Sequence, residues 1–374
     1  MRGYSKKLIL GSGLVILVLL GAGFTLGIYS LKTMREVVSD QFNKQQLVLA
    51  EQAARQIEDQ LKTVIQELGL LNQSPAVQRL EEGRWSNRIK ITQSVVRKLG
   101  VVEIGRVDAA GKTVYFVDIN EQAQISPRGP RHPKEVLSWA GLPENRGRIK
   151  VIKEGFSEGP LPGRPLLMLA LPAYRDTVNR PHPGRTFAGY LYGLVDREQL
   201  VAQVVKGIRS GASGYGWAID DRGNFIYHPL PEFVGRNAFS VREQRGAPVS
   251  FEQINAIQRD KMLRGEQGTA WYFSGWHREL KGKIKKLIAY SPVRMEFSTA
   301  ALNWSVAVVA PITEVDEAIQ MVYARQLLME GFILLAILLG GFLLLGFQWD
   351  QTRALKGEVE EKTRDWLQSE KRYR

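Results

Sequence analysis

Alternating residues near the middle of the chain carry side chains suited to holding a small polar ligand. In a predicted strand over Phe187–Val195, Tyr190, Tyr192, Leu194 and the following Asp196 share one face, because successive side chains on a strand point to opposite sides. Tyrosine supplies a flat apolar surface and a hydroxyl, and a carboxylate pairs with an ammonium group. These residues predict one wall of a binding pocket. Two structural alternatives stay open, because alternate tyrosines also form cores and Asp196 could cap the helix that follows it.

Four further side chains are candidates for the same pocket. Trp139 lies on a predicted helix over 133–139 and would close the top of the cavity. Arg131, just before that helix, would hold a ligand carboxylate through two hydrogen bonds. Tyr174 ends the preceding strand, and Tyr115 lies on an earlier strand.

The amino-acid composition and the absence of known catalytic motifs argue against a catalytic or metal-binding site. The 374 residues include no cysteine, which excludes disulfides, thiolate zinc sites and cysteine nucleophiles. His228 stands between a tyrosine and a proline at the end of a predicted strand, where a structural hydrogen bond is expected. The sequence has no phosphate-binding loop, no GGDEF-like motif and no nucleophile elbow. We therefore predict no catalytic residue, metal or cofactor in this chain, so that any kinase or cyclase output would be missing or on a partner chain.

Two uncharged segments are long enough to cross a membrane. Residues 8–31 and 331–349 are apolar runs of 24 and 19 residues, and each can span a ~30 Å hydrocarbon core as a helix. The first run is longer than the apolar core of a signal peptide and is expected to remain as an anchor. Gly23 and Gly27 within it form a G-x-x-x-G pair that could pack two helices closely.

The charge distribution predicts the orientation of the chain. Three basic residues precede the first span, which places the N-terminus in the cytoplasm. We expect a two-pass protein of the bacterial inner membrane with both termini cytoplasmic and residues 32–330 outside. The net charge of +13 is spread among mixed acidic and basic groups, without the basic track that a nucleic-acid partner needs.

A helical stalk is predicted directly after the first span. Between residues 33 and 73, apolar residues recur at spacings of four and three, which puts them on one face of a helix: Ala50, Ala54, Ile57, Leu61, Val64, Leu68 and Leu71. Ser74-Pro75 ends the helix, because proline disfavours helical geometry in the residue before it. The position beside a span indicates a stalk that carries the outer region, although an unattached coiled coil would show the same pattern.

The outer region contains an internal repeat. A predicted strand pair with the turn Asp108–Gly111 returns 112 residues later with the turn Asp220–Gly223. In each turn an acidic residue caps the backbone and glycine supplies a positive φ. The later elements also correspond: strand 166–171 with 287–291, strand 187–195 with 304–310, and helix 133–139 with 251–264. We predict an α+β fold with two tandem modules, each a mainly antiparallel sheet with helices on one face.

The amino-acid sequence of the second module is similar to that of a known sensor family. The order of elements, a span, a helix, two modules and a second span, resembles the double Cache (dCache) extracytoplasmic region of bacterial receptors. Four segments of the second module carry the resemblance in sequence: SGYGWAIDDRGNFIYHP, VGRN, KKLIAYSPV and WSVAVVAPITEV. The tail ALKGEVEEKTRDWLQSEKRYR resembles the signalling helix that leads into a PAS domain in sensor histidine kinases and diguanylate cyclases. The resemblance implies a receptor input truncated before such a domain, with PAS-like modules and the usual sensing pocket in the membrane-distal one.

Together these features predict the following organisation: cytoplasmic N-terminus 1–7, transmembrane helix 8–31, stalk helix 33–73, membrane-distal Cache module 76–200, membrane-proximal Cache module 205–311, connecting helix 312–330, transmembrane helix 331–349 and cytoplasmic signalling helix 350–374. The expected function is a transmembrane signal receptor, acting as a homodimer, that binds a small ligand in the distal module and signals through the second span. The alternative is a membrane-anchored scaffold that docks a partner protein through its outer modules.

The resemblance also bears on the kind of ligand. The amino-acid-binding subgroup of that family carries a tyrosine, an arginine and a Trp-Tyr pair in a tight spacing on the distal module. This sequence lacks that spacing. The expected ligand is therefore a carboxylate other than an amino acid, an amine or another small metabolite.

Overall fold

The computed structural model describes residues 2–79, 84–118, 123–124, 134–153, 164–176, 185–246, 249–297 and 301–373. They fall into two compact units, Gln41–Glu314 and a unit of Met1–Asp40 with Val315–Arg374. Among these residues the helices are α1 (Arg2–Gln73), α2 (Pro75–Arg79), α3 (Arg84–Val96), α4 (Lys134–Ala140), α5 (Arg197–Val205), α6 (Ala238–Arg245), α7 (Glu252–Asp260) and α8 (Thr313–Tyr373), with the 3-10 helices η1 (Arg97–Leu99), η2 (Pro143–Asn145), η3 (Pro231–Phe233) and η4 (Met262–Arg264). The strands are β1 (Val101–Val107), β2 (Thr113–Asp118), β3 (Ala123–Gln124), β4 (Lys150–Ile152), β5 (Leu166–Asp176), β6 (Arg185–Asp196), β7 (Tyr215–Ile219), β8 (Phe225–Tyr227), β9 (Gly268–His277), β10 (Leu280–Glu296) and β11 (Ala301–Pro311).

The unit formed by the two chain ends contains the first part of α1 and most of α8. Gly13–Ser30 of α1 and a window within the stretch Ala324–Glu370 of α8 are apolar and long enough to be candidate membrane helices. A Cβ atom added to Gly23 would lie 3.2 Å from Cδ2 of Leu334, and one added to Gly27 would collide with the carboxylate of Glu330. The two glycines therefore lie where two helices of the same chain approach each other, in keeping with the predicted close packing.

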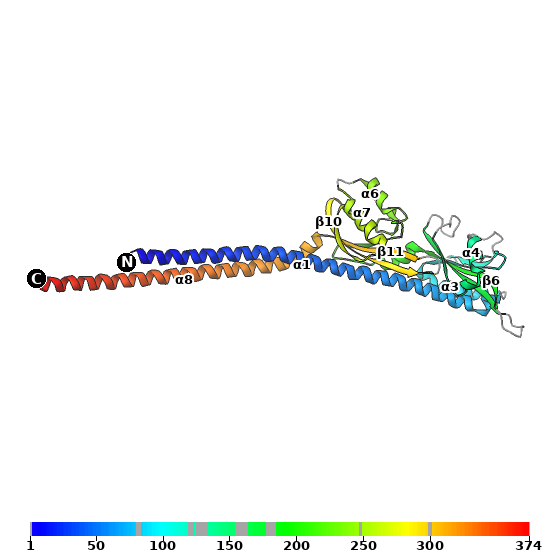
Figure 1. Cartoon of the computed structure of the whole chain (residues 1–374), viewed down its shortest axis with the longest axis horizontal. Coiled ribbons are helices and arrows are strands. Elements are labelled where there is room, and N and C mark those ends of the chain that lie inside the picture. The colour runs from blue at the N-terminus through cyan, green and yellow to red at the C-terminus, as the bar shows by residue number, and fades with distance from the viewer. Residues whose placement is uncertain are drawn as a thin grey trace. The chain divides into compact units, whose positions relative to one another are not determined.

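Two antiparallel sheets make up most of the unit Gln41–Glu314 (Figure 1). The first has the strand order β3-β2-β1-β6-β5-β4, and the second has the order β8-β7-β11-β10-β9. If the short β3 is set aside, the two orders correspond strand for strand. The duplication predicted from the repeated sequence pattern is therefore confirmed.

The two repeated turns have the predicted local geometry. Oδ1 of Asp108 and Oδ1 of Asp220 each accept hydrogen bonds from two backbone amides of their own turn, at 2.8–3.0 Å. Gly111 and Gly223 have φ values of 83° and 81°, which glycine adopts without steric penalty. Each hairpin is thus specified by two residues of its turn.

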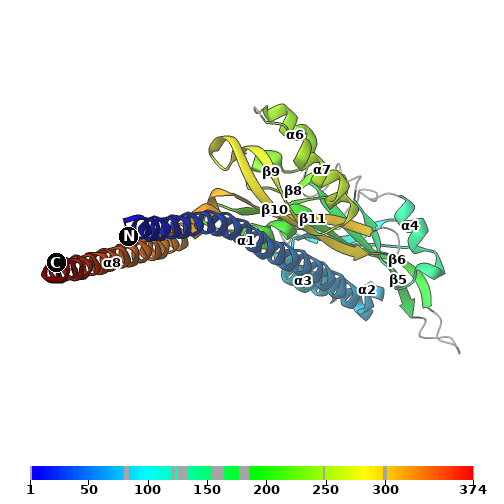
Figure 2. The same ribbon diagram turned by 60° about the vertical axis from the view of Figure 1, so that its left-hand side comes forward.

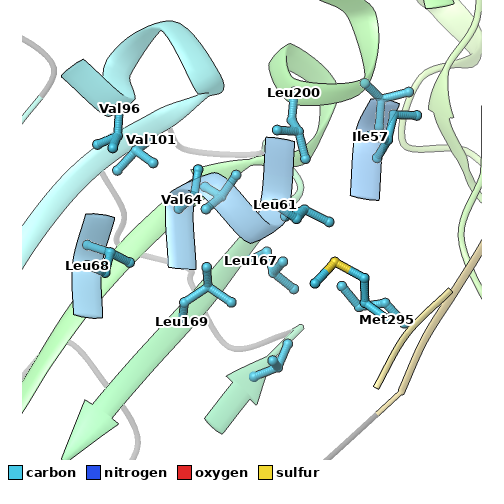
Figure 3. Packing of buried hydrophobic residues seen from close by; sticks show 14 of the residues in the cluster. Ile57, Leu61, Val64, Leu68, Val96, Val101, Leu167, Leu169, Leu200 and Met295 are labelled. Carbon is cyan, nitrogen blue, oxygen red and sulfur yellow. The ribbon is translucent and has the colours of Figure 1, made fainter. Parts of the chain in front are cut away.

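The outer part of α1 packs against both sheets (Figure 2). All seven residues of the predicted apolar seam are buried. Six of them join one cluster, together with the neighbouring Ala53: Ala54, Ile57, Leu61, Val64, Leu68 and Leu71. The same cluster contains Leu167 and Leu169 of β5 and Met295 of β10. Figure 3 shows Leu61 and Val64 close to Leu167 and Leu169, with Met295 on the side of the second sheet. The helix ends at Gln73, before Pro75, as expected.

The structure corrects the expectation that helices cover only one face of each sheet. The α1 side is one covered face; α4 covers the opposite face of the first sheet, and α6 and α7 cover the opposite face of the second (Figures 1 and 2). Every residue of β1 and of β7 is buried. Strands whose side chains are buried on both faces need a covering layer on both sides.

Candidate ligand-binding site

Tyr190 and Tyr192 of β6 lie together on the face of the first sheet that α4 covers. Both side chains are buried, and their ring centroids are 6.3 Å apart. Leu194 belongs to the same cluster, which also contains Val136 and Ala140 of α4. Tyr190, Tyr192 and Leu194 therefore share one face of the sheet, as the alternation of side chains along a strand predicts. That face packs against α4.

Two charged side chains of β1 are buried beside these tyrosines. Oε1 of Glu103 accepts a hydrogen bond of 2.7 Å from the hydroxyl of Tyr192. Arg106 donates to the backbone carbonyls of Ala188 at 2.9 Å and Tyr190 at 3.3 Å. Burial lowers the pKa of Arg106 to about 10. Sequence reasoning missed both residues; the available signal was a charge at each of two positions in the otherwise apolar strand VVEIGRV.

Three other predicted residues lie in three different surroundings. Trp139 of α4 packs against the Tyr190 cluster, and the Nζ atom of Lys150 lies 5.7 Å from the centroid of its ring. Tyr115 lies in the core on the α1 side of the sheet. Tyr174 lines a cavity of about 280 Å³ near the end of α1, where the guanidinium carbon of Arg146 is 5.4 Å from its ring centroid.

Asp196 is fully buried and has two structural partners. Its Oδ1 atom accepts the backbone N–H of Gln199 at 3.1 Å, which caps α5, and its Oδ2 atom accepts a hydrogen bond of 2.8 Å from Arg164. The capping role that the sequence left open is thus observed. Arg131 lies outside the described residues. Of the predicted site residues, the structure brings three into contact with one cluster: Tyr190, Tyr192 and Trp139.

A second cavity, of about 20 Å³, lies within the second sheet's layer, on the side of α6 and α7. Its polar and aromatic lining comes from four strands, a helix and a 3-10 helix and includes Tyr215, Phe225, Phe233, Arg242, Trp276 and Lys286. None of these residues was predicted as a site residue. The centroids of Phe225 and Phe233 are 5.8 Å apart, and those of Phe233 and Trp276 are 6.0 Å apart, so the apolar wall is continuous.

Arg242 brings a buried guanidinium to this cavity. Asn237 caps the start of α6 by accepting the N–H of Phe239, and Arg242 then lies on the buried face of that helix with 7% of its surface exposed. Its Nη1 atom donates to Oδ1 of Asn255 at 3.1 Å and to Oε1 of Gln258. Burial lowers the pKa of Arg242 to about 10. Its hydrogen-bond acceptors are neutral amides.

Lys286 brings a second cation from β10. Its side chain is 1% exposed, and its Nζ atom donates to the hydroxyl of Tyr215 at 3.3 Å. Burial, together with the positive charge of Arg242, lowers the pKa of Lys286 to about 7. The sequence signal was the pair Lys285-Lys286 at the start of an apolar strand, where alternation sends one lysine to each face. Lys285 indeed lies over Trp271, 4.3 Å from its ring centroid.

The two histidines near the cavity are held neutral. Burial is the main cause that lowers the pKa of His228 to about 3 and that of His277 to about 4, and the charge of Lys286 adds to it. Nδ1 of His228 accepts the backbone N–H of Leu230 at 3.0 Å. The structural hydrogen bond expected for His228 is therefore confirmed.

A series of contacts connects the cavity with the start of α8. Tyr215, which accepts from Lys286, stacks on His277 with centroids 5.2 Å apart. Nε2 of His277 is 3.0 Å from Oγ of Ser213, and that hydroxyl donates to Oε1 of Glu314 at 2.5 Å. Glu314 lies in the first turn of α8, so a change at Lys286 has a contiguous route to that helix.

Comparisons with known proteins agree with this architecture. The family model for the Cache domain, dCache_1, matches residues 30–319. No curated protein matches the chain. The extracellular domain of vpHK1S-Z8, assigned as a histidine kinase, has a TM-score of 0.50 and 17% identity, with 76% of this chain and 96% of that chain covered.

Two other solved structures show a similar level of likeness. The ligand-binding domain of the Pseudomonas fluorescens chemoreceptor CtaA, solved with L-isoleucine, has a TM-score of 0.47 and 14% identity, with 76% of this chain and 99% of that chain covered. An extracellular ligand binding receptor from Desulfohalobium retbaense DSM5692 has a TM-score of 0.44 and 16% identity over 71% of this chain, which spans 40% of that receptor's length. Because the family match extends over most of the sequence and the paired sheets agree with it, this chain belongs to the Cache domain family of sensory input modules.

Proposed function

We propose that this protein is a two-pass receptor of the bacterial inner membrane, acting as a homodimer, that binds a small ligand outside the cell membrane and signals to a cytoplasmic output. The observation that carries the proposal is the single core shared by α1 and the two sheets. Because one set of side chains contacts the helix and both sheets, a rearrangement in either sheet changes the packing of α1. The basic residues before the first span support cytoplasmic termini.

We assign ligand binding in the distal module to the α4 side of the first sheet. Tyr190, Tyr192 and Trp139 would form apolar walls there, and Arg131 would hold a carboxylate. A ligand shifts the receptor between two arrangements only by binding one of them more tightly. The chain itself supplies no catalysis in this proposal; a kinase or cyclase activity would belong to a further domain or a partner.

The exit from the second sheet into α8 is supported by backbone hydrogen bonds. The N–H of Ile312 donates to the carbonyl of Lys285 at 2.9 Å. The carboxylate of Glu314 accepts the backbone amides of Ala212 and Ser213, each at 2.7 Å. The start of α8 is therefore anchored to two separate parts of the second sheet's layer, and motion of that layer would move the helix.

The test uses the full chain in lipid nanodiscs, screened against metabolites by thermal shift. A true ligand raises the melting temperature by mass action, by an amount equivalent to about 2.7 kcal/mol at a hundredfold excess over Kd. Trp139→Ala is expected to weaken that ligand. Since the chain has no native cysteine, a spin label on Leu355→Cys reports the spacing of the two tails in the dimer.

The ligand is expected to change the distance distribution between these labels. If a confirmed ligand leaves the distribution unaltered, signalling through the second span is contradicted. If no metabolite shifts the melting temperature, ligand binding is contradicted and a scaffold that docks a protein partner becomes the better description.

A further inference from the structure

The cavity of about 280 Å³ at the C-terminal end of α1 plays no part in the proposed function. It lies on the α1 side of the first sheet, since Leu171 in its wall belongs to the core shared with α1, and Tyr190 and Tyr192 lie on the other side. Its lining comes from α1, α2, β5 and the loop between η2 and β4. The volume is far above the room that one water molecule needs and suits a small metabolite.

Two buried polar atoms at this cavity have no hydrogen-bond partner among the described residues. They are Oδ1 of Asn72 and the hydroxyl of Tyr174. Nδ2 of Asn72 donates to the carbonyl of Pro172 at 2.9 Å, which fixes the amide and leaves Oδ1 as an acceptor. The ring of Tyr174 is held by contacts with Phe187 and Arg146, at 5.9 Å and 5.4 Å. A buried polar atom without a partner carries a free-energy penalty, which a ligand group would remove.

Two arginines give the cavity a positive charge. Arg146 and Arg148 both line it, and its described lining contains no aspartate or glutamate. Gly147 between them has a φ of 74°, a turn conformation that glycine adopts without strain. Both arginine side chains are exposed, so they can turn toward a ligand without first breaking a buried contact. A guanidinium presents paired donors that match the two oxygens of a carboxylate.

A glycine in α1 leaves the space of this cavity open. Gly69 lies within the helix, where glycine is less favourable than alanine, and a Cβ atom added to it would have no neighbour within 4 Å. Close packing therefore does not require glycine here. Gly69 lines the cavity, so a larger side chain at this position would occupy part of it.

These groups define the chemistry of a matching ligand. The arginines and the phenol of Tyr174 are donors and favour an acid group, whereas Oδ1 of Asn72 needs a donor in return. An ammonium group is a poor donor for this position, because the described lining offers it two cations and no carboxylate. A neutral hydroxyl meets the same need without repulsion.

We propose that this cavity binds a small hydroxycarboxylate. Its carboxylate would pair with Arg146 and Arg148 and accept a hydrogen bond from Tyr174, and its hydroxyl would donate to Asn72. The site is separate from the α4 side of the first sheet and stands whether or not that side binds a ligand. Because α1 and β5 both supply its walls, occupancy would act directly on the packing of α1.

The test is calorimetric titration of the full chain in nanodiscs, at ionic strength kept constant with sodium chloride. The probes are the sodium salts of glycolate, lactate and malate, the last two as both enantiomers. Each is compared with the acid that lacks the hydroxyl: acetate, propionate or succinate. We expect saturable binding of at least one hydroxycarboxylate, about tenfold or more tighter than its counterpart, because only the former supplies a donor to Asn72.

The variants separate loss of the site from loss of the fold. Gly69→Leu is expected to abolish binding and yet to raise the melting temperature by about 2 °C, since it puts a helix-forming residue into open space. Removing both charges with Arg146→Gln and Arg148→Gln should weaken binding by about tenfold or more. Leu70→Ala and Arg55→Gln, whose side chains are exposed elsewhere on α1, are the matched controls and should leave affinity unchanged.

Three results would overturn the proposal. The first is absence of saturable binding of every hydroxycarboxylate by the wild-type chain. The second is equal affinity for each hydroxy acid and its counterpart. The third is unchanged affinity in a folded Gly69→Leu variant. If affinity is then lost in Trp139→Ala instead, the hydroxycarboxylate belongs to the α4 side, and the proposed function stands without this second site.

Discussion

At the scale of single residues, the most informative group is the amine of Lys286. Unfolded lysine titrates near 10.5, whereas burial and the charge of Arg242 lower the pKa of Lys286 to about 7 in the folded chain. Its other titratable neighbours change charge elsewhere: His228 near 3, His277 near 4 and Tyr215 near 12. Arg242 loses its proton only above about pH 10. Among these groups, only Lys286 therefore changes its protonation between about pH 7 and pH 10.

In that window the unfolded chain holds a proton that the folded chain has released. The free energy of unfolding must then rise with pH, by about 2 kcal/mol between pH 7 and 9 for this one group. Lys286→Met is expected to raise the melting temperature near pH 7 and to remove this slope. Tryptophan fluorescence melts at both pH values measure it, with Lys285→Met as control. An unchanged slope in Lys286→Met would show that the amine is not buried as described.

At the scale of elements, α1 is a structural part of both sheets. Its face with Ile57, Leu61, Val64 and Leu68 is fully buried, whereas Leu70 on another face is 61% exposed. Helical periodicity places these leucines on different sides although they are close in sequence. The helix is therefore held by one stripe, and the two faces should respond differently to truncation.

Leu61→Ala is expected to lower the free energy of unfolding by about 2–5 kcal/mol, since it opens a cavity between the helix and the sheets. Leu70→Ala should change it by less than about 0.5 kcal/mol. Urea denaturation of the two variants beside the wild type makes the comparison. Equal losses in both would contradict a core shared by α1 and the sheets.

At the scale of the whole molecule, the amino-acid composition itself makes the topology testable. The chain lacks cysteine, so each introduced thiol is the only reactive one. Ala110, in the turn between β1 and β2, and Ser369, near the end of α8, are both exposed in the structure. A two-pass receptor puts these positions on opposite sides of the membrane.

We expect an impermeant maleimide to label Ala110→Cys on intact spheroplasts and to label Ser369→Cys only after the membrane is opened. Gel shifts with a bulky maleimide give the readout. Labelling of Ser369→Cys on intact spheroplasts would contradict the proposed orientation. Protection of Ala110→Cys would do the same.

The parts of this protein that could be predicted are those decided by neighbours in the chain. The seam of α1, its end before Pro75 and the turns at Asp108 and Asp220 follow from helical spacing, proline sterics and glycine's access to positive φ. The common face of Tyr190 and Tyr192 follows from strand alternation. Each needs only a few consecutive residues, so the sequence alone determines it.

The tertiary structure decided everything that depends on which elements meet. A register shift between Ala173 and Tyr174 interrupts the alternation of β5, which period-two reasoning from the sequence does not include. Only the fold brings Arg164, 32 residues earlier in the chain, to the second carboxylate oxygen of Asp196. Arg242 and Lys286 come from a helix and a strand that no local pattern relates, and only the packing of α6 on the second sheet brings both side chains to one cavity.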